Sequence, residues 1–472
     1  MIPLILFIII PSAFLAAIAV TRRHCRLLST ASAFAGLALS TIIFATTLLS
    51  GSSSIISQSY SYIPSLGIQF TLSVSNISQV LLLMASIILL ATALSGNMGR
   101  EKEKLSSLLI VLFQIGAYGL FISGNFFLFF IFWDIGVIAP FFMINILGSA
   151  NRRIASYKFI LYELFSSALL LTAIILVYFY SPGHTLQIYP LSSLYSSMPV
   201  YIQETIFSLF FLAFMINMPL FPLHTWLPDA HSEASTQGSM ILSGILTKFG
   251  GFGMLIIFLT MPIAGSFSKY IAALAGISAF YAAFLMMRQR DIKRIVAHTT
   301  IIEMSIIMFA IAAMTTIGYE GALYGMLSHG LVVALMFLAA GAIEHMFHER
   351  NIGVLKGLSR YAKLTSYVFL IGIFVMSGLP LTTGFVSDLL IFIGGIEAFG
   401  LYGIIPIFSL VLLAGFMYFV INKSFFANRQ ATRPSEHITV SAKAGYAILL
   451  LAIFVFGALP FIVLNLVNSG FI

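Results

Sequence analysis

Seven ionisable side chains lie within long apolar stretches of the sequence, where charged groups are unusual. They are four acids, one lysine and two histidines: Asp134, Glu163, Lys248, His298, Glu303, His329 and Asp388. Each is costly in hydrocarbon, so we expect it to face protein or a hydrated cavity. Buried carboxylates and lysines exchange protons more readily near neutral pH, and imidazole already titrates there. We interpret the series as a proton or ion relay, with isolated structural ion pairs as the alternative.

Composition places these residues in a membrane protein. Of 472 residues, 60% are hydrophobic and 8% are charged, whereas soluble domains carry about 25% charged residues. Apolar runs of about 20 residues, the length that spans a bilayer, recur along the chain. These features exclude a soluble enzyme, a secreted disulfide-rich domain and a nucleic-acid-binding protein. A single cysteine, Cys25, excludes an internal disulfide and a cysteine-ligated iron–sulfur cluster.

We expect an all-α polytopic membrane protein with about fourteen transmembrane helices. The apolar stretches are 2–20, 28–50, 76–96, 105–123, 125–148, 156–180, 202–222, 237–260, 270–287, 294–314, 318–346, 365–395, 401–422 and 444–467. The first stretch lacks a basic region before it and an obvious cleavage site, so we interpret it as a retained span and not as a signal peptide.

The basic residues orient this arrangement. If the N-terminus faces outward, every Lys and Arg except two falls in a loop on the inner side, as the positive-inside rule requires. The exceptions are Lys269, in an outer loop, and Lys248, within a span. We therefore expect both termini on the outer side, with Gly51–Ser75 as an outer loop and Ala427–Ser441 as a polar inner loop.

Two predicted spans contain internal breaks. The seventh has Pro219 and Pro222 directly after Asn217, and the twelfth has Pro380 shortly before Asp388. Broken helices in corresponding positions are typical of inverted repeats that meet at a transport site, although prolines also kink packed helices. Because the breaks are five helices apart, we predict two inverted five-helix repeats, helices 4–8 and 9–13. The predicted divisions are 1–104 for helices 1–3, 105–260 and 270–422 for the repeats, and 423–472 for an inner loop and the last helix.

Several segments carry a family resemblance. Residues 222–234 read PLHTWLPDAHSEA and residues 238–248 read GSMILSGILTK; shorter matches are IPSLGI at 63–68, DIKRIVA at 291–297, SHGL at 328–331 and HERNI at 348–352. The chain resembles the antiporter-like membrane subunits of respiratory complex I, a superfamily shared with Mrp antiporters and membrane-bound hydrogenases. The likeness covers about residues 60–395 and is strongest to the M-type subunit.

The resemblance implies roles for four residues. The family's acid on the fifth helix, which follows a tryptophan, corresponds to Asp134. The eighth-helix lysine at the centre of the proton path corresponds to Lys248. The eleventh-helix histidine corresponds to His329, and the twelfth-helix group that governs proton exit corresponds to Asp388.

The chain also departs from the family pattern. The lysine that usually precedes Met-Pro on the seventh helix is replaced by Asn217, which cannot carry charge. Glu303 stands where the tenth helix usually has a histidine, with His298 nearby. Glu163 lies outside the pattern, and two interpretations stay open: it compensates for Asn217, or it pairs with a basic residue at 158 or 152.

A third histidine borders the inner loop after the broken seventh helix. His224, together with Asp229 and His231, either lines a path of proton uptake or fixes that loop in place. We therefore include His224 with Glu163, Glu303 and His298 as secondary candidates for the proton path.

We predict a non-redox subunit of a translocase, which moves protons, or alternatively Na+, in the membrane arm of a complex-I-like pump. The resemblance implies no cofactor or metal in this chain, with flavin and iron–sulfur clusters in partner subunits. Expected partners are other antiporter-like and small membrane subunits, a peripheral redox arm and the lipid bilayer, most simply a prokaryotic plasma membrane. The alternatives are a subunit of an Mrp-type Na+/H+ antiporter or of a membrane-bound hydrogenase, and a non-pumping structural subunit.

Overall fold

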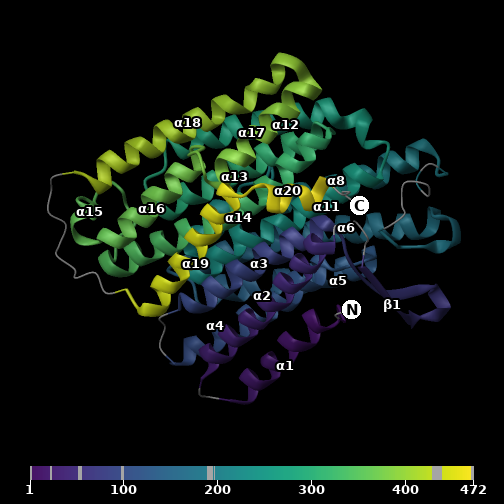
Figure 1. Cartoon of the computed structure of the whole chain (residues 1–472), viewed down its shortest axis with the longest axis horizontal. Coiled ribbons are helices and arrows are strands. Elements are labelled where there is room, and N and C mark those ends of the chain that lie inside the picture. The colour runs from purple at the N-terminus through teal and green to yellow at the C-terminus, as the bar shows by residue number, and fades with distance from the viewer. Residues whose placement is uncertain are drawn as a thin grey trace.

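The structure, a computed structural model, describes residues 3–21, 24–50, 56–96, 100–188, 195, 197–427 and 438–468 of the 472. Its helices run along one another as a single bundle (Figure 1). All the candidate path residues lie within the described ranges. Four of the basic residues that oriented the sequence, Arg22, Arg23, Arg429 and Arg433, lie outside them, as does most of the predicted inner loop 427–441.

Nineteen α-helices are assigned in the described part of the chain, in the following order. They are α1 (Leu6–Val20), α2 (Cys25–Ser50), α3 (Asn76–Leu94), α4 (Arg100–Phe121), α5 (Phe126–Asn145), α6 (Arg152–Tyr180), α8 (Val200–Asn217), α9 (Trp226–Glu233), α10 (Thr236–Ile241), α11 (Thr247–Thr260), α12 (Ala264–Met286), α13 (Ile292–Ala312), α14 (Thr316–Phe347), α15 (Leu358–Tyr361), α16 (Lys363–Met376), α17 (Thr383–Phe399), α18 (Ile405–Val420), α19 (Val440–Ala458) and α20 (Phe461–Asn468).

These helices confirm a polytopic membrane protein. Within the described residues, twelve helical segments are long and apolar enough to cross a membrane, and α1 and α16 are apolar but shorter. Each of the fourteen predicted stretches coincides with helical structure. The segment Thr383–Phe425 contains both α17 and α18, separated by the 3₁₀ turn Gly400–Ile404, and α16 and α17 are the two halves of the predicted twelfth span.

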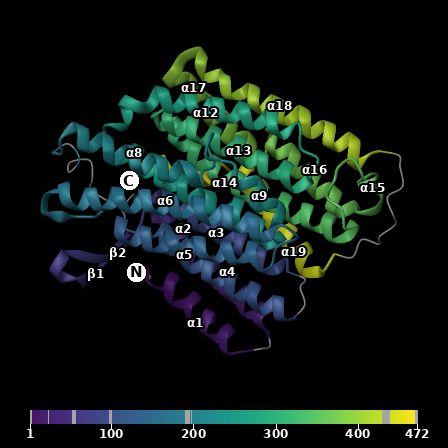
Figure 2. The same cartoon turned by 180° about the vertical axis from the view of Figure 1, so that it is seen from behind.

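The predicted outer loop 51–75 contains a β-hairpin that the sequence reading did not anticipate. Strands β1 (Ile56–Ile63) and β2 (Ile68–Val74) pair antiparallel, with Ile56 opposite Val74. The chain reverses at Gly67, whose φ of 66° is a left-handed conformation that glycine adopts without strain. The hairpin extends from one end of the bundle, which is also the end towards which the N and C labels lie (Figures 1 and 2).

The neighbour relations of the helices repeat along the chain. In the first set, α4 packs on α5, α5 on α6 and α6 on α8; in the second, α12 packs on α13, α13 on α14, and α14 on α16 and α17. Each set contains one interrupted helix, α8–α9 in the first and α16–α17 in the second. This order agrees with two five-helix units, while the boundaries 105–260 and 270–422 stay a prediction.

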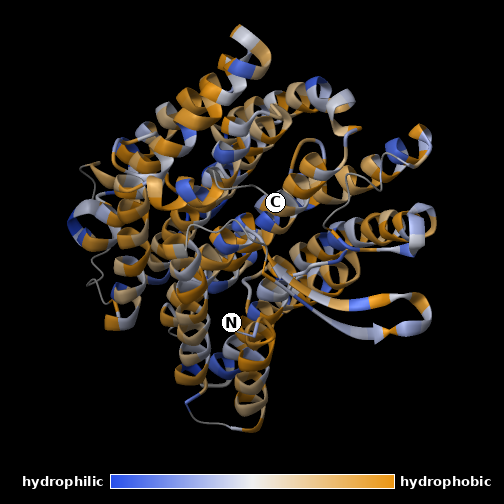
Figure 3. Ribbon diagram, turned by 45° about the vertical axis from the view of Figure 1, so that its right-hand side comes forward, coloured by the Kyte–Doolittle hydropathy of each residue, from blue (hydrophilic) through white to orange (hydrophobic). Residues whose placement is uncertain are grey.

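The helices that carry the ionisable residues lie at the centre of the bundle. In the most apolar 18 residues of Thr236–Thr260 and of Ile292–Ala312 every residue is buried within the protein, whereas in those of Val440–Ala458 only 33% are buried. Figure 3 shows hydrophobic residues along most of the helical surface, with hydrophilic residues concentrated near helix ends and turns. Groups on α11 and α13 therefore contact other helices and not lipid.

Glycines bring α14 and α17 into close contact in the second set. A Cβ added at Gly394 would meet the backbone nitrogen of Gly318 at 2.5 Å, and one at Gly321 would meet that of Ile391 at 2.7 Å. Small residues of this kind let membrane helices approach closely. The approach fixes the position of α17, the helix that carries Asp388, against α14, the helix that carries His329.

Candidate ion-translocation site

Lys248 is the centre of the site and lies wholly inside the bundle. Its side chain has no exposed surface, and its Nζ lies 2.6 Å from His329 Nδ1, 2.5 Å from the carbonyl oxygen of Ser243 and 3.3 Å from Thr247 Oγ1. An ammonium group has three protons to donate, so these three partners satisfy it completely. The structure therefore brings together two of the four principal residues predicted from the sequence, the lysine on α11 and the histidine on α14.

A local change in helix geometry makes this arrangement possible. Between α10 and α11 the helix widens to a π-helix over Leu242–Leu246, and the Thr247 N–H donates to the carbonyl of Leu242, five residues earlier. Such segments are frequent at functional sites. Here the Ser243 carbonyl accepts from Thr247 Oγ1 at 2.9 Å and from Lys248 Nζ. The widened turn thus supplies a backbone acceptor for a buried cation.

A small cavity joins His329 to two acids, Glu303 and Asp388. All three residues lie in the second set of helices, which is called the second half, as the first set is called the first half. Glu303 on α13, His329 on α14 and Asp388 on α17 all line the cavity. The cavity leaves about 10 Å³ for the centre of a water molecule, enough for at least one water. His329 Nε2 is buried and has no hydrogen-bond partner among the described residues, while the other ring nitrogen, Nδ1, contacts Lys248.

The first half holds a second cluster, in which two acids and an asparagine replace the expected acid–lysine pair. Asp134 on α5 accepts a hydrogen bond from Ser167 Oγ on α6. Glu163, also on α6 and 1% exposed, accepts from Asn217 Nδ2, which lies 3.4 Å from each of its carboxylate oxygens. Asn217 Oδ1 in turn accepts from the Gly250 N–H at 2.9 Å, two residues beyond Lys248.

Among the described contacts, Glu163 pairs with neither of the basic residues that the second interpretation named. Lys158 is paired instead with Asp229 at 2.8 Å, and no described contact joins Glu163 to a basic residue. The acid outside the family pattern is thus bonded to the position where the pattern is broken. The cluster therefore contains two carboxyl groups and an amide, and no basic side chain contacts it among the described residues.

The two secondary histidines lie apart from these clusters. His298 on α13 is bound through Nδ1 to the Arg294 carbonyl of its own helix at 2.7 Å. His224, in the connection between α8 and α9, packs beside Tyr281, with ring centroids 5.5 Å apart. Burial, followed by the nearby charges of His298 and Lys158, lowers the pKa of His224 to about 4. His224 is therefore neutral at physiological pH.

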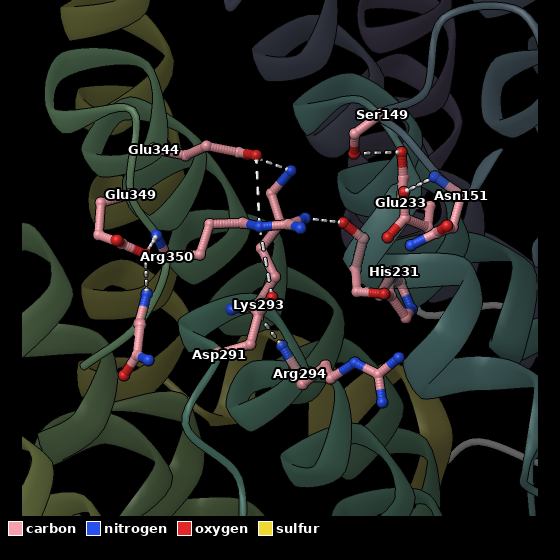
Figure 4. Close-up of polar contacts among 12 residues, drawn as sticks. Ser149, Asn151, His231, Glu233, Asp291, Lys293, Arg294, Glu344, Glu349 and Arg350 are labelled. Carbon is pink, nitrogen blue, oxygen red and sulfur yellow. Dashed lines mark hydrogen bonds and ion pairs between the residues drawn. The ribbon is translucent and has the colours of Figure 1, made fainter. Parts of the chain in front are cut away.

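An ion-pair network fixes the inner end of the broken helix (Figure 4). Arg350 Nε lies 3.3 Å from Asp291 Oδ2 and 3.7 Å from Glu344 Oε1, and its Nη1 donates to the Ser232 carbonyl of α9. Lys293 Nζ lies 2.5 Å from Glu344 Oε2. Burial raises the pKa of Asp291, and the Arg350 guanidinium offsets part of that rise. The network joins α9 of the first half to α13 and α14 of the second.

Other contacts of α9 complete its attachment. Asp229 pairs with Lys158 and with Arg294, both at 2.8 Å. Glu233 accepts from the Asn151 N–H at 2.9 Å (Figure 4). Asp229 was considered either to line a path of proton uptake or to fix the loop in place. These contacts support the second role.

Comparison with known proteins identifies the family. Residues 123–414 match the family described as NADH:quinone oxidoreductase/Mrp antiporter, TM. The chain belongs to this family. It is 31% identical over 339 residues to NADH-quinone oxidoreductase subunit M of Rickettsia felis, which covers 71% of this chain and 68% of that protein. It is 30% identical over 383 residues to F(420)H(2) dehydrogenase subunit M of Methanosarcina mazei, covering 78% and 76%.

Solved structures share the fold of this family member over nearly its whole length. A chain of respiratory complex I from Thermus thermophilus with bound NADH has a TM-score of 0.90 at 23% identity, covering 99% of this chain and 98% of that one. A chain of the Mrp complex from Dietzia sp. DQ12-45-1b has a TM-score of 0.89 at 19% identity, covering 99% and 96%. The antiporter-like fold predicted from the motifs is thereby confirmed.

Sequence reasoning missed several polar groups around the family's ionisable residues. Ser167, Ser243 and Thr247 bond directly to Asp134 or Lys248. His231 on α9 is fully buried and stacked on Phe337, with ring centroids 4.5 Å apart. Hydroxyl residues are common in membrane helices, so nothing in their spacing marked them. His231 was named from the sequence together with His224 and Asp229, but its stacking on Phe337 was not foreseen.

The described residues contain no group of three or more His, Cys, Asp or Glu side chains arranged to hold a metal ion.

Proposed function

We propose that this chain is the proton-translocating membrane-arm subunit of a complex-I-like redox-driven pump. The observation that carries the proposal is the contact between the buried side chains of Lys248 and His329, together with the cavity that His329 lines with two acids. The names of the relatives, subunit M of NADH-quinone oxidoreductase and of F(420)H(2) dehydrogenase, support the same assignment.

The geometry supports a defined order of proton transfers, from Lys248 through His329 to Glu303 or Asp388. When Lys248 is charged, His329 Nδ1 accepts its hydrogen bond and His329 Nε2 carries the ring proton. Transfer of a proton from Lys248 Nζ to Nδ1 leaves a neutral amine, and the imidazolium then releases its Nε2 proton into the cavity. A water there delivers it to Glu303 or Asp388, and the lysine is ready to be recharged.

The first half supplies protons to Lys248 in this scheme. Asp134 and Glu163 lie on neighbouring helices, and Asn217 bridges Glu163 to the backbone of α11. An asparagine cannot take up the proton that a lysine would carry. We therefore assign proton storage to the two acids, with waters between this cluster and Lys248, and secondary roles to His224 and His298 near the inner end.

The proposal includes the surroundings of the chain. Redox cofactors, flavin and iron–sulfur clusters, belong to partner subunits in a peripheral arm, and other antiporter-like and small membrane subunits adjoin this one. The chain resides in a prokaryotic plasma membrane with both termini outside. In Figure 1 the N and C labels both lie towards the hairpin end of the bundle, and this supports an even number of crossings.

Lys248→Ala tests the assignment in membrane vesicles that contain the whole complex. Proton uptake, followed with a pH-sensitive dye, is expected to be lost while electron transfer from donor to acceptor continues. Lys248→Met keeps most of the side-chain volume and controls for packing. Lys363→Ala, at an exposed lysine that starts α16, is expected to leave both activities unchanged. Normal proton uptake in both Lys248 variants would overturn the proposed path.

A Na+-coupled subunit, of the Mrp or membrane-bound hydrogenase type, is the second candidate. The observation that favours it is the replacement of the usual lysine by Asn217 beside two acids, a cluster rich in oxygen atoms that no basic side chain contacts among the residues that the structure describes. Uptake of ²²Na+ that depends on electron transfer and disappears in Glu163→Gln would support it. A non-pumping subunit would instead show no change in ion movement for either Asn217→Lys or Lys248→Ala.

A further inference from the structure

A long apolar groove runs along the surface of the second half, between α12, α18 and the turn that follows α17. Its volume is about 900 Å³, and its floor is formed by small residues on successive turns of α12, Ala272, Ala273 and Gly276. A Cβ added at Gly276 would meet only Ile405 Cγ2, at 3.9 Å. Helices in a membrane normally pack closely at such small residues, yet Ala273 is exposed and all three residues line the groove.

One end of the groove is polar. A second cavity, lined by Ser266, Ser268 and Lys269, adjoins it, and both cavities share Lys269, Ala398 and Phe399. Lys269 is exposed and forms no ion pair with any residue that the structure describes. It is also the one basic residue that the sequence places in an outer loop, against the general distribution of charge. The positive-inside rule therefore does not explain why a lysine occupies this position, and another role has to account for it.

The position of Lys269 along α12 corresponds to the membrane surface. Tyr270, which follows it in the chain and lines the second cavity, and Tyr402, which lines the groove, are 77% and 75% exposed, and exposed tyrosines are typical of the lipid headgroup level. From Lys269 to Tyr281, the groove-lining residues of α12 extend over about 18 Å at 1.5 Å per residue. One leaflet of the hydrocarbon core is about 15 Å deep, so the groove reaches from the surface to about the bilayer centre.

We propose that this groove binds one anionic phospholipid from the leaflet at the hairpin end of the bundle. The phosphate contacts Lys269 and the hydroxyl of Ser266, and one acyl chain lies against Ala272, Ala273 and Gly276. Charge complementarity favours a lipid over a transmembrane helix, because a helix would bury the Lys269 ammonium without supplying an anion. The polar and apolar ends of the groove match the two parts of a lipid.

The bound lipid would pack against α13 and α17, two of the helices that carry residues of the proposed path. Phe309, which lines the groove, lies on α13 less than two turns beyond Glu303, and Ala398 and Phe399 end the helix that carries Asp388. Removal of the lipid is therefore expected to loosen the packing of α13 and α17. The lipid proposal is independent of whether the chain moves protons or Na+, because the residues that line the groove are not residues of the proposed ion path.

Native mass spectrometry of the full chain, purified with the chains that accompany it, tests the proposal. The probes are dioleoyl phosphatidylglycerol and dioleoyl phosphatidylcholine, added separately in matched amounts. We expect phosphatidylglycerol to bind more tightly. Lys269→Gln should weaken its binding roughly fivefold, since one lysine near a membrane surface attracts an anionic lipid by about 1 kcal/mol. Binding of phosphatidylcholine should not change in this variant.

Gly276→Phe should block both lipids by filling the groove. Gly415→Phe is the matched control, because Gly415 is an exposed glycine of α18 with no atom within 4 Å of an added Cβ, and it should bind both lipids normally. Equal binding of the two lipids, or unchanged phosphatidylglycerol binding in Lys269→Gln and Gly276→Phe, would overturn the proposal. So would loss of a co-purifying subunit from Gly276→Phe, which would identify the groove as a protein interface.

Discussion

Replacement of Asn217 by leucine removes the connection between the acid cluster and α11 while nearly preserving volume. The Gly250 N–H loses the oxygen that accepts from it at 2.9 Å, and Glu163 loses the amide donor 3.4 Å from its two oxygens. An unsatisfied buried group costs about 1–3 kcal/mol, so the two losses predict a destabilisation of about 2–6 kcal/mol. Because Asn217 has no exposed surface, water cannot replace the lost contacts.

The free energy of unfolding, measured by circular dichroism in detergent titrated with SDS, provides the assay. Glu163→Leu removes the partner, so the double variant Asn217→Leu/Glu163→Leu no longer leaves a carboxyl group without a donor. We expect it to be about 1–3 kcal/mol more stable than the sum of the single changes predicts. Asn422→Leu, at an exposed asparagine of the inner end, should change stability by less than about 0.5 kcal/mol. Strict additivity of the two buried changes would refute the reasoning, because it would mean that Glu163 and Asn217 do not act as a pair.

Three further predictions concern stability. Burial lowers the pKa of His224 to about 4, so at this residue the folded state binds fewer protons than the unfolded state between about pH 4 and pH 6.5. Its contribution to the free energy of unfolding should be full above about pH 6.5 and fall by about 1–2 kcal/mol between pH 7 and pH 5. Tm should fall across this range, and it should fall less in His224→Gln; part of the fall should persist in that variant, because burial also lowers the pKa of His231, to about 3. Gly394→Ala would place a methyl group 2.5 Å from a backbone nitrogen of α14 and should cost about 1–3 kcal/mol in the same unfolding assay, whereas Gly415→Ala should be neutral. Arg350→Met removes a charged donor to the Ser232 carbonyl and should cost about 2 kcal/mol; an unchanged midpoint would show that the network at the inner end contributes nothing.

Hydropathy and charge were sufficient to predict the spans, because each has to satisfy the bilayer independently of the others. All fourteen predicted stretches coincide with helices. Boundaries were less accurate where polar residues extend a helix beyond the apolar run, as at Arg152 in α6. The hairpin at 56–74 was missed because its first strand is rich in serine and its second depends on contacts with a helix end, such as the Ser73 N–H donating to the Ile122 carbonyl at 2.7 Å.

Within the site, residue types were predictable and partners were not. The cost of a charge in the membrane pointed to Lys248 and Glu163 individually. The Lys248–His329 contact joins residues 81 positions apart, so it depends on how α11 packs against α14. The π-helix at Ser243 lies in an ordinary helical sequence, LSGIL, and arises from packing that no local pattern encodes.

The Arg350 network and the Lys248–His329 contact hold the two sets of helices together without a covalent bond. The two sets of helices are joined along the chain only by the short turn 261–263, at the end of the bundle opposite to the ion pairs. Since non-covalent contacts bind the halves at mid-membrane and at the inner surface, a cleaved turn would leave them associated. The chain should therefore tolerate division there into two co-expressed polypeptides that reassemble into an active subunit.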